Sequence, residues 1–246
     1  MNIVLFESSE ITGTGQVVLA KRDPRGIHLI KVLHKKAGDS FEAGVLQGKK
    51  GKSRIEQIGS DGSIICSLDV TEEAPRRLPV RIEVGFPRPI QVRRILRDLS
   101  GMGIESIDLV GTDTGEKSYQ DTTLLTDGGA RAALIEGAIQ ARDTILPHLH
   151  QYRNFDELLL SPPWQPDSFL VAADNVSPAG SFFDPTNHHS RIVIAIGSER
   201  GFSDRERKLL EEAGFIRLSM GDRPLRTESA CIAAAILSQI HLLSKN

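Results

Sequence analysis

The sequence predicts an α/β protein in two parts, a small N-terminal β-barrel and a larger C-terminal domain with a largely parallel sheet. In the first seventy or so residues, short apolar or alternating runs are separated by turn-forming residues, a pattern typical of closely spaced strands. After residue 80, apolar runs alternate with segments of helical spacing, which indicates parallel strands joined by helices. A chain of 246 residues has room for two such domains.

The N-terminal domain is expected to span residues 1–73. Its expected strands are residues 2–6, 16–20, 40–45, 53–58 and 63–68. One segment departs from this pattern, because residues 27–33 are apolar at positions 29, 30, 32 and 33, a spacing that predicts a short helix. Residues 72–79 are polar and contain two prolines, so we expect a linker there.

The C-terminal domain is expected to span residues 80–246. Its expected strands are residues 80–85, 104–110, 169–173, 192–196 and 215–218, and its expected helices are residues 90–100, 129–142, 203–213 and 228–243. Two of these strands, 169–173 and 192–196, are continuously apolar, as expected where both faces of a sheet are covered. The last helix is apolar on nearly every side, so either the domain or a second subunit must cover it.

The charge balance excludes a uniformly basic nucleic-acid binder. The chain has 30 basic and 32 acidic residues, a formal net charge of −2, which leaves room only for a local basic patch. Residues 21–54 provide one, with ten basic and three acidic residues. We interpret this segment as a surface that faces RNA phosphates, the alternative being a solvated face balanced by acids elsewhere. The candidate RNA contacts are Arg22, Arg25, Lys31, Lys35, Lys49, Lys50 and Lys52.

Other protein classes are disfavoured by what the sequence lacks. Two cysteines are too few for a disulfide framework or for a structural zinc site of their own, and no other spacing of metal ligands stands out, so we expect no metal. Residues 1–9 do not have the order of a signal peptide, and no apolar run approaches the roughly 18 residues of a membrane span. We therefore expect a soluble cytoplasmic protein.

The most informative segment is residues 192–203, where a buried strand runs into a loop that contains Gly197 and Gly201. A helix follows at once, because Ser203 and Glu206 fit a capping box. Ligands of open α/β sheets bind at the carboxyl ends of strands, and glycine lets a ligand approach the backbone. The loop matches neither the dinucleotide nor the nucleoside-triphosphate motif. A tight strand–helix turn without a ligand is the alternative interpretation.

A second segment of this kind spans residues 218–230. It again follows a short strand and opens a helix, with Thr227 as the expected N-cap and Glu228 in the first turn, where a negative charge suits the helix dipole. Capping explains these two residues completely. It does not explain Arg226, nor a loop that holds Gly221 and Pro224, so we treat this loop as a second candidate ligand contact.

Taken together, the two loops resemble the paired motifs of the RsmE family of 16S ribosomal RNA methyltransferases, which belong to the SPOUT class. The family usually reads G-[PS]-E-G-G-[FL]-S and then L-G-x-x-[IV]-L-R-T-E-T-A. Here residues 197–203 read GSERGFS and residues 220–230 read MGDRPLRTESA. Residues 28–33 with Gly38-Asp39, residues 101–104, and Ile139-Gln140 with Pro147 resemble further family segments, so the similarity covers nearly the whole chain.

The resemblance implies a PUA-like β-barrel in residues 1–73 and a SPOUT domain with a deep trefoil knot in residues 80–246. It implies a homodimer that binds S-adenosylmethionine in the knot and methylates N3 of a uridine in 16S ribosomal RNA of the 30S subunit. Arg226 would stabilise charge on the uracil or anchor a phosphate, and Glu228 would orient Arg226 or assist proton removal. The expected cofactor contacts are Ala173, Ile196, Gly197, Ser198, Glu199, Gly201, Ser219, Met220, Gly221, Leu225, Arg226, Thr227 and Ala230.

The sequence departs from the family pattern at three places. Arg200 stands where the cofactor loop usually has its second glycine, His34 stands where an arginine is common, and Arg142-Asp143 replaces a Gly-Arg pair. Two alternatives to uridine methylation therefore stay open. One is a related methyltransferase that acts on another RNA. The other is a non-catalytic RNA-binding protein in which Arg200 blocks the cofactor loop.

Overall fold

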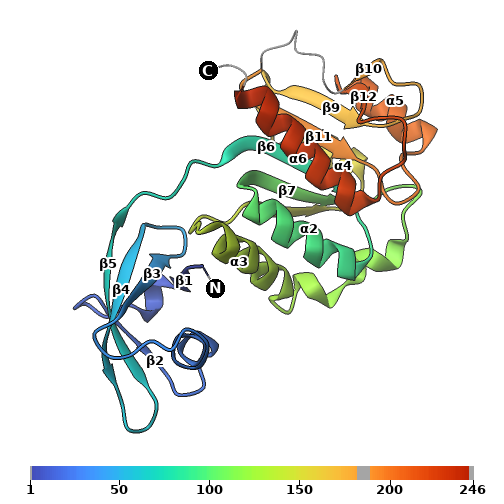
Figure 1. Cartoon of the computed structure of the whole chain (residues 1–246). Helices are drawn as coiled ribbons and strands as arrows, with labels where there is room; N and C mark the ends of the chain where they lie inside the picture. Colours follow the sequence, from blue (N-terminus) through green and yellow to red (C-terminus); the bar gives the residue numbers. More distant parts are fainter. Residues whose placement is uncertain (1, 182–188, 244–246) are drawn as a thin grey trace. The chain divides into compact units, whose positions relative to one another are not determined.

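The computed structural model describes residues 2–181 and 189–243. The chain forms two compact units (Figure 1). The first consists of Met1–Arg76 together with Ala138–Leu146, and the second consists of Arg77–Gly137 together with Pro147–Asn246.

A five-stranded sheet organises the first unit. Its strands are β1 (Val4–Phe6), β2 (Gln16–Leu19), β3 (Ser40–Val45), β4 (Lys50–Ile58) and β5 (Ile64–Glu72). The spatial order is β1-β3-β4-β5-β2, with β1 parallel to β3 and the other pairs antiparallel. Each expected strand overlaps one of these. Alternate side chains such as Phe6, Leu19 and Ile55 are fully buried in one core, as the period of two requires.

The expected short helix at residues 27–33 is present but begins earlier. Helix α1 (Pro24–Ile27) continues into a π-helical turn, η2 (His28–Val32), and a 3₁₀ turn, η1 (Ser8–Glu10), lies before β2. Asp23 starts α1, because its carboxylate accepts a hydrogen bond from the Arg25 backbone N–H at 2.8 Å and a proline occupies the first helical position. The buried Leu29 side chain attaches this segment to the core.

The segment Ala138–Leu146 groups with the first unit, although the sequence predicted it within the C-terminal domain. Backbone groups explain this. The Gln47 N–H donates to the Thr144 carbonyl oxygen at 2.9 Å, and the Thr144 hydroxyl donates to the Gly48 carbonyl oxygen. The Asn2 amide also donates to the Gln140 carbonyl oxygen at 2.8 Å. These bonds join positions about a hundred or more residues apart, which local sequence patterns do not reveal.

The second unit is built on a seven-stranded parallel sheet, which confirms the predicted α/β class. The order in the sheet is β10-β12-β9-β11-β6-β7-β8, and every pair is parallel. The strands are β6 (Leu78–Gly85), β7 (Ile104–Val110), β8 (His148–Tyr152), β9 (Phe169–Ala173), β10 (Gly180–Ser181), β11 (Ile192–Ile196) and β12 (Ile216–Ser219).

Helices cover both faces of this sheet (Figure 1). They are α2 (Pro89–Gly101), α3 (Gly129–Ala141), α4 (Phe155–Leu160), α5 (Asp204–Glu212) and α6 (Thr227–Leu243), with 3₁₀ turns η3 (Lys117–Asp121) and η4 (Thr123–Leu125). Helices α2 and α6 pack against each other, α2 against β7, and α6 against β6 and β11. Phe155 and Leu158 of α4 and Leu210 of α5 pack with Val193 of β11 in a separate core. Because successive strand residues face opposite sides, this core lies on the other face of β11 from its isoleucines.

Besides the 3₁₀ turns η3 and η4, three elements of the second unit were not predicted: β8, α4 and the short β10. Strand β8 lies at the edge of the sheet, and none of its five residues is buried. Its sequence is rich in histidine and other polar groups, so it lacks the apolar run that marks a central strand. In the part of the chain that the structure describes, no helix is long and apolar enough to cross a membrane, and no group of side chains could hold a metal ion.

Candidate functional site

A cavity of about 290 Å³ lies at the carboxyl ends of β9, β11 and β12, where open α/β sheets bind ligands. All of the predicted cofactor residues line it except Ser219 and Arg226. The loops of residues 197–201 and 220–225 therefore meet at one place, as the sequence predicted from their separate positions after strands. Three further lining residues, Arg200, Arg223 and Pro224, belong to the two predicted loops, whereas Asp174 and Asn175 were not predicted from the sequence. Asp174 and Asn175 directly follow β9, so their place after a buried strand was an available signal.

The first loop is a tight turn closed by its own backbone. The Gly201 N–H donates to the Ser198 carbonyl oxygen at 2.9 Å, and Gly201 has a φ of +72°. A Cβ atom on Gly197 would lie 2.7 Å from the Gly201 carbonyl carbon, so this close approach requires glycine. Helix α5 then begins with the predicted capping box: the Ser203 hydroxyl accepts from the Glu206 N–H at 3.1 Å, and the Glu206 carboxylate accepts from the Ser203 N–H at 2.8 Å.

The loop that follows β7 braces this first loop. The Thr114 hydroxyl donates to the Gly201 carbonyl oxygen at 2.7 Å and lies 2.9 Å from the Ser198 hydroxyl. Next to it, the Asp113 carboxylate accepts hydrogen bonds from Ser203 and Arg205. The bonds from Arg205 hold the pKa of Asp113 below its usual value, so the carboxylate stays charged and the brace stays formed at neutral pH.

The second loop turns sharply after β12. Gly221 has a φ of +122°, and no heavy atom lies within 4 Å of the position that a Cβ atom would take. Gly221 is exposed and lines the cavity. Ser219 does not line the cavity but supports the turn, because its hydroxyl accepts from the Gly221 N–H at 3.1 Å. Asp174, after β9, is buried and bound to Arg207 at 2.6 Å.

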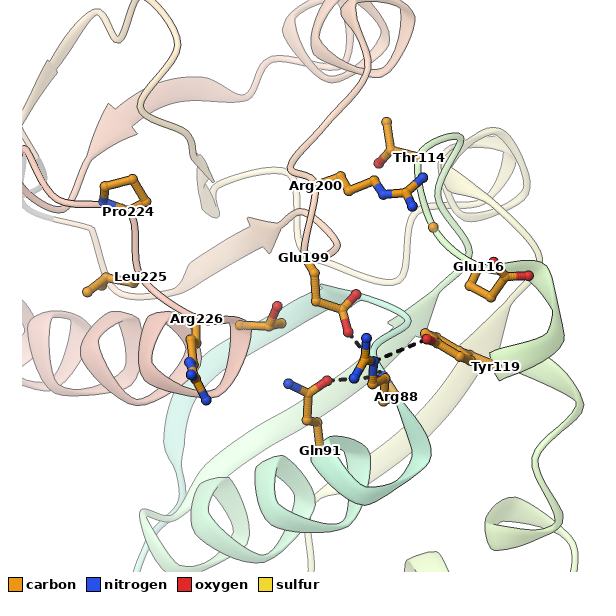
Figure 2. Close-up of a pocket in the computed structure, with 12 residues that line it drawn as sticks. Arg88, Gln91, Thr114, Glu116, Tyr119, Glu199, Arg200, Pro224, Leu225 and Arg226 are labelled. Carbon is orange, nitrogen blue, oxygen red and sulfur yellow. Dashed lines mark hydrogen bonds between the residues drawn. The ribbon is translucent and has the colours of Figure 1, made fainter.

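A second, larger cavity of about 540 Å³ adjoins the first. Five residues line both cavities: Glu199, Arg200, Pro224, Leu225 and Thr227. Figure 2 shows how the other walls are made from the start of α2 and from the loop after β7. The Arg88 backbone N–H donates to Glu199 Oε1 at 3.3 Å, and Arg88 Nε donates to the Tyr119 hydroxyl at 3.2 Å. Sequence reasoning did not identify Arg88 or Tyr119.

The two predicted catalytic residues, Arg226 and Glu228, have different surroundings in the structure. Arg226 is exposed and lines the larger cavity. Glu228, in the first turn of α6, accepts a hydrogen bond from Gln91 Nε2 at 3.2 Å and lies 3.9 Å from Arg94 of α2. Among the described residues, no hydrogen bond or ion pair joins Glu228 to Arg226. The contact by which Glu228 was expected to orient Arg226 is therefore absent from this structure. The hydrogen-bond partner of Glu228 is Gln91, which lines the larger cavity.

Of the basic residues predicted to contact RNA, Arg25 has a structural role. Its guanidinium binds the carboxylates of Glu10 and Asp23 at 2.5 and 2.7 Å and lies over the ring of Phe6. The hydrogen bond to Glu10, and then the one to Asp23, raise the pKa of Arg25, so the guanidinium stays charged within this cluster. A cation held by two carboxylates has little remaining capacity for a phosphate.

The other candidate cations fall into two groups. Lysines of the β4 region have acidic neighbours. Lys49 forms an ion pair with Glu73 at 2.9 Å. In the sheet, Lys50 lies opposite Glu72, and Lys52 lies between Glu42 and Asp69 of the two neighbouring strands. The second group consists of Arg22, Lys31 and Lys35. These three side chains form no ion pair with any residue that the structure describes. The two groups therefore differ in how much of their charge is already neutralised.

Comparisons with known proteins agree with this geometry. A family model described as an RNA methyltransferase domain matches residues 74–239. "Ribosomal RNA small subunit methyltransferase E" of Treponema pallidum is 39% identical over 98% of this chain and 92% of its own length. "Ribosomal RNA small subunit methyltransferase E 1" of Borreliella burgdorferi is 28% identical over 99% of this chain and all of its own.

Solved structures share the fold. A probable rRNA-methyltransferase from Porphyromonas gingivalis superposes with a TM-score of 0.79 at 19% identity, over 99% of this chain and 100% of the other. A ribosomal RNA small subunit methyltransferase E from Neisseria gonorrhoeae, bound to S-adenosyl methionine, has a TM-score of 0.77 at 19% identity over 97% of each chain. At this identity the likeness concerns the fold alone.

Proposed function

The chain belongs to the RsmE family of RNA methyltransferases, and from this premise we propose that it transfers a methyl group from S-adenosylmethionine to small-subunit ribosomal RNA. One observation carries the proposal. The two loops that bear the family motifs begin at Gly197 and Met220, 23 positions apart in the chain, and they line a single cavity at the carboxyl ends of the central strands. The names of the matched relatives support the same activity.

The cavity at these loops is the proposed cofactor site. The place of Gly221 in the lining supports this, because a residue without a side chain lets a ligand approach its backbone closely. The backbone of residues 196–201 and of residues 220–225 would hold the adenosyl group. S-adenosylmethionine would supply an electrophilic methyl group on its sulfonium sulfur.

We propose uridine N3 of 16S RNA as the acceptor. A bond forms between N3 and the methyl carbon while the carbon–sulfur bond breaks, and the N3 proton leaves to solvent. Removal of that proton places negative charge on the uracil, and Arg226 stabilises this charge or anchors a phosphate. Glu228 acts indirectly, by holding Gln91 at the wall of the larger cavity. The base must leave its stack to reach the methyl group, and holding both reactants in line supplies much of the rate.

The domain assignments belong to the same proposal. Residues 1–73 form a PUA-like barrel that contacts RNA, and residues 80–246 form a SPOUT domain whose trefoil knot lies around the cofactor loops. The supporting features are the mainly antiparallel five-stranded sheet of the first unit and the all-parallel sheet of the second. A protein that modifies the small ribosomal subunit works in the cytoplasm, which is where we place it.

The proposed assembly is a homodimer. Helix α6 exposes Ile236, Ile240 and Leu243, with 44%, 54% and 58% of their surface accessible. Their spacing of four and three residues puts them on one stripe of the helix. An apolar stripe of this kind is typical of a contact with another subunit, and a two-fold symmetric contact is the commonest form.

Two measurements test the function. Calorimetry with S-adenosylmethionine should give binding without added metal, which would exclude the non-catalytic alternative. Nucleoside mass spectrometry of 16S RNA from a strain that lacks this gene should show loss of 3-methyluridine, restored by the gene. If 3-methyluridine persists while another methylated nucleoside disappears, the target is different and the uridine assignment is wrong.

A further inference from the structure

The larger cavity has features that the cofactor does not need. Five of its lining residues also line the proposed cofactor site, so the two cavities adjoin. Its volume of about 540 Å³ is within the range of roughly 300–1,000 Å³ typical of sites for small organic ligands. Direct methyl transfer requires the acceptor to enter from a space next to the methyl donor. This cavity is such a space.

The charge of the cavity suits a phosphate. Three arginines, Arg88, Arg200 and Arg226, line it from three separate segments of the chain. None of the three forms an ion pair with a carboxylate of the described residues. Nearby arginines behave differently, since Arg205 binds Asp113 and Arg207 binds Asp174.

Two glutamates, Glu116 and Glu199, also line the cavity. Glu199 accepts from the backbone N–H of Arg88, and Glu116 accepts from the Ser118 hydroxyl. Neither carboxylate therefore neutralises a guanidinium, although both lie near the arginines. Apart from the Arg88 Nε donor, which binds the Tyr119 hydroxyl, the three guanidinium groups keep their donors for a ligand that carries negative charge.

An aromatic ring completes the cavity. Tyr119, half-buried in η3, is the one aromatic side chain in the lining, and its hydroxyl accepts from Arg88 Nε at 3.2 Å. The ring and the guanidinium are thus held together, and the two terminal guanidinium nitrogens of Arg88 form no hydrogen bond with the described residues (Figure 2). Unstacked RNA bases are commonly received on an aromatic face, with arginine at the phosphate.

Arg200, which stands at a usual glycine of the family motif, belongs to this cavity. In Figure 2 its side chain extends toward Thr114 and Glu116, away from Pro224 and Leu225 on the wall shared with the cofactor site. The departure from the motif thus adds a cation on the side of the larger cavity. Arg200 lines the smaller cavity as well, but in this view its guanidinium lies on the side of Thr114.

We propose that the larger cavity receives the target nucleotide of the RNA, with the base stacked on Tyr119 and the phosphate held by Arg88 and Arg200. The proposal rests on the methyltransferase function above and assigns the acceptor side of that site. It makes Tyr119 and Arg200 determinants of RNA binding and leaves cofactor binding to the smaller cavity.

The test separates RNA kinetics from cofactor affinity. The variants are Tyr119→Ala, Tyr119→Phe and Arg200→Gly, the last of which installs the residue usual in the family. Methylation of 30S particles is measured for kcat and KM, and S-adenosylmethionine binding by calorimetry. Arg153→Ala is the matched control, because this arginine is 89% exposed and lines neither cavity.

We expect Tyr119→Ala to raise KM for the particles about tenfold, with the cofactor Kd unchanged. Arg200→Gly should also raise KM about tenfold, with a smaller change in the cofactor Kd, because Arg200 lines both cavities. Tyr119→Phe, which keeps the ring, should have the smaller effect. Arg200→Gly should also make RNA affinity less dependent on salt, by the amount expected for the loss of about one phosphate contact. Arg153→Ala should change neither KM nor the salt dependence.

Other results overturn the proposal. If the wild type methylates RNA and both Tyr119→Ala and Arg200→Gly keep its KM, the cavity is not the acceptor site, although the methyltransferase function stands. If the variants lose cofactor affinity and keep their RNA affinity, the assignment of the two cavities is wrong. If the wild type neither binds S-adenosylmethionine nor methylates RNA, the function itself fails and this inference falls with it.

Discussion

The hydroxyl of Thr114 lies 2.9 Å from the hydroxyl of Ser198, although the two residues are 84 positions apart in the chain. Thr114 also donates to the Gly201 carbonyl oxygen. A side chain from the loop after β7 therefore holds both ends of the turn that carries the first family motif. The conformation of the proposed cofactor loop depends on a neighbouring strand as well as on its own glycines.

The first prediction concerns this brace. Thr114→Val keeps the shape of the side chain but removes the hydroxyl. The Gly201 carbonyl oxygen then keeps only its longer bond from the Ser198 hydroxyl, at 3.3 Å, and the loop becomes less ordered. A lost hydrogen bond at a partly buried site costs about 1–2 kcal/mol. We expect calorimetry to give a several-fold weaker affinity for S-adenosylmethionine. Thr126→Val, which removes a hydroxyl bonded only within its own turn, serves as the control and should leave the affinity as it is.

The second prediction concerns Gly221. Gly221→Ala puts a methyl group into the open space of the proposed cofactor site and imposes strain at a φ of +122°. Affinity for S-adenosylmethionine should fall at least tenfold. Gly103→Ala is the matched control, because Gly103 also has a positive φ and open space around its Cβ position but lies outside both cavities. Equal affinity losses in both variants would attribute the effect to backbone strain rather than to the site.

Local patterns predicted the parts of this site that depend on neighbouring residues. The capping box of Ser203 and Glu206 was correct because both partners lie within one helical turn. The loops at Gly197 and Gly221 were expected to meet a ligand because each follows a strand, and parallel strands end at a common edge. The alternation of strands and helices likewise predicted the parallel sheet.

Features that depend on distant residues escaped prediction. The Thr114 brace, the Arg88–Tyr119 bond and the grouping of Ala138–Leu146 with the first unit all join segments that the sequence keeps apart. Residues 21–54 do carry an excess of basic residues, but Lys49 forms an ion pair with Glu73, which lies outside that segment. Strand pairing decides which charges meet, and a window along the chain contains only one side of each pair.

The third prediction separates the two groups of basic residues. Replacing Arg22, Lys31 and Lys35 together should weaken RNA binding for all sequences. The slope of the logarithm of the RNA binding constant against the logarithm of salt concentration should become shallower by about two. The triple replacement of the lysines in the β4 region should have a smaller effect, since these charges are largely balanced in the folded protein. The two triple variants are Arg22→Ala/Lys31→Ala/Lys35→Ala and Lys49→Ala/Lys50→Ala/Lys52→Ala.

Filter binding of a 16S RNA fragment between about 50 and 200 mM salt measures both slopes. Circular dichroism of each triple variant serves as the folding control. A lower slope only for the lysines of β4 would reverse the assignment and make those lysines the phosphate contacts. Equal slopes in all three proteins would remove residues 21–54 from the RNA interface.

The fourth prediction concerns the dimer. Ile236→Glu combined with Ile240→Glu places two charges on the exposed stripe of α6, where burial against a second subunit would desolvate them at high cost. Sedimentation of the wild type at micromolar concentration should give about twice the chain mass of 26.9 kDa, and the double variant should give the monomer. Leu160→Glu, at a position 86% exposed on α4, is the control and should stay dimeric. A monomeric wild type with full activity would contradict the proposed assembly.

The last prediction concerns the reaction. Arg226 lines the larger cavity and is absent from the lining of the smaller one, so its charge faces the acceptor rather than the donor. Arg226→Ala should therefore lower kcat by roughly a hundredfold, the scale for removing a group that stabilises developing charge, while the Kd for S-adenosylmethionine stays within about twofold.

Arg226→Lys tests whether charge alone is sufficient, because it keeps the cation but loses the planar fork of donors. Partial recovery of kcat with lysine would indicate an electrostatic role at the uracil, whereas no recovery would indicate a bidentate contact with a phosphate. If Arg226→Ala instead weakens cofactor binding and leaves kcat intact at saturating cofactor, Arg226 acts on the donor side. The assignment of the larger cavity to the acceptor and the smaller one to the cofactor would then be wrong, because a residue that lines only the larger cavity would contribute to cofactor binding.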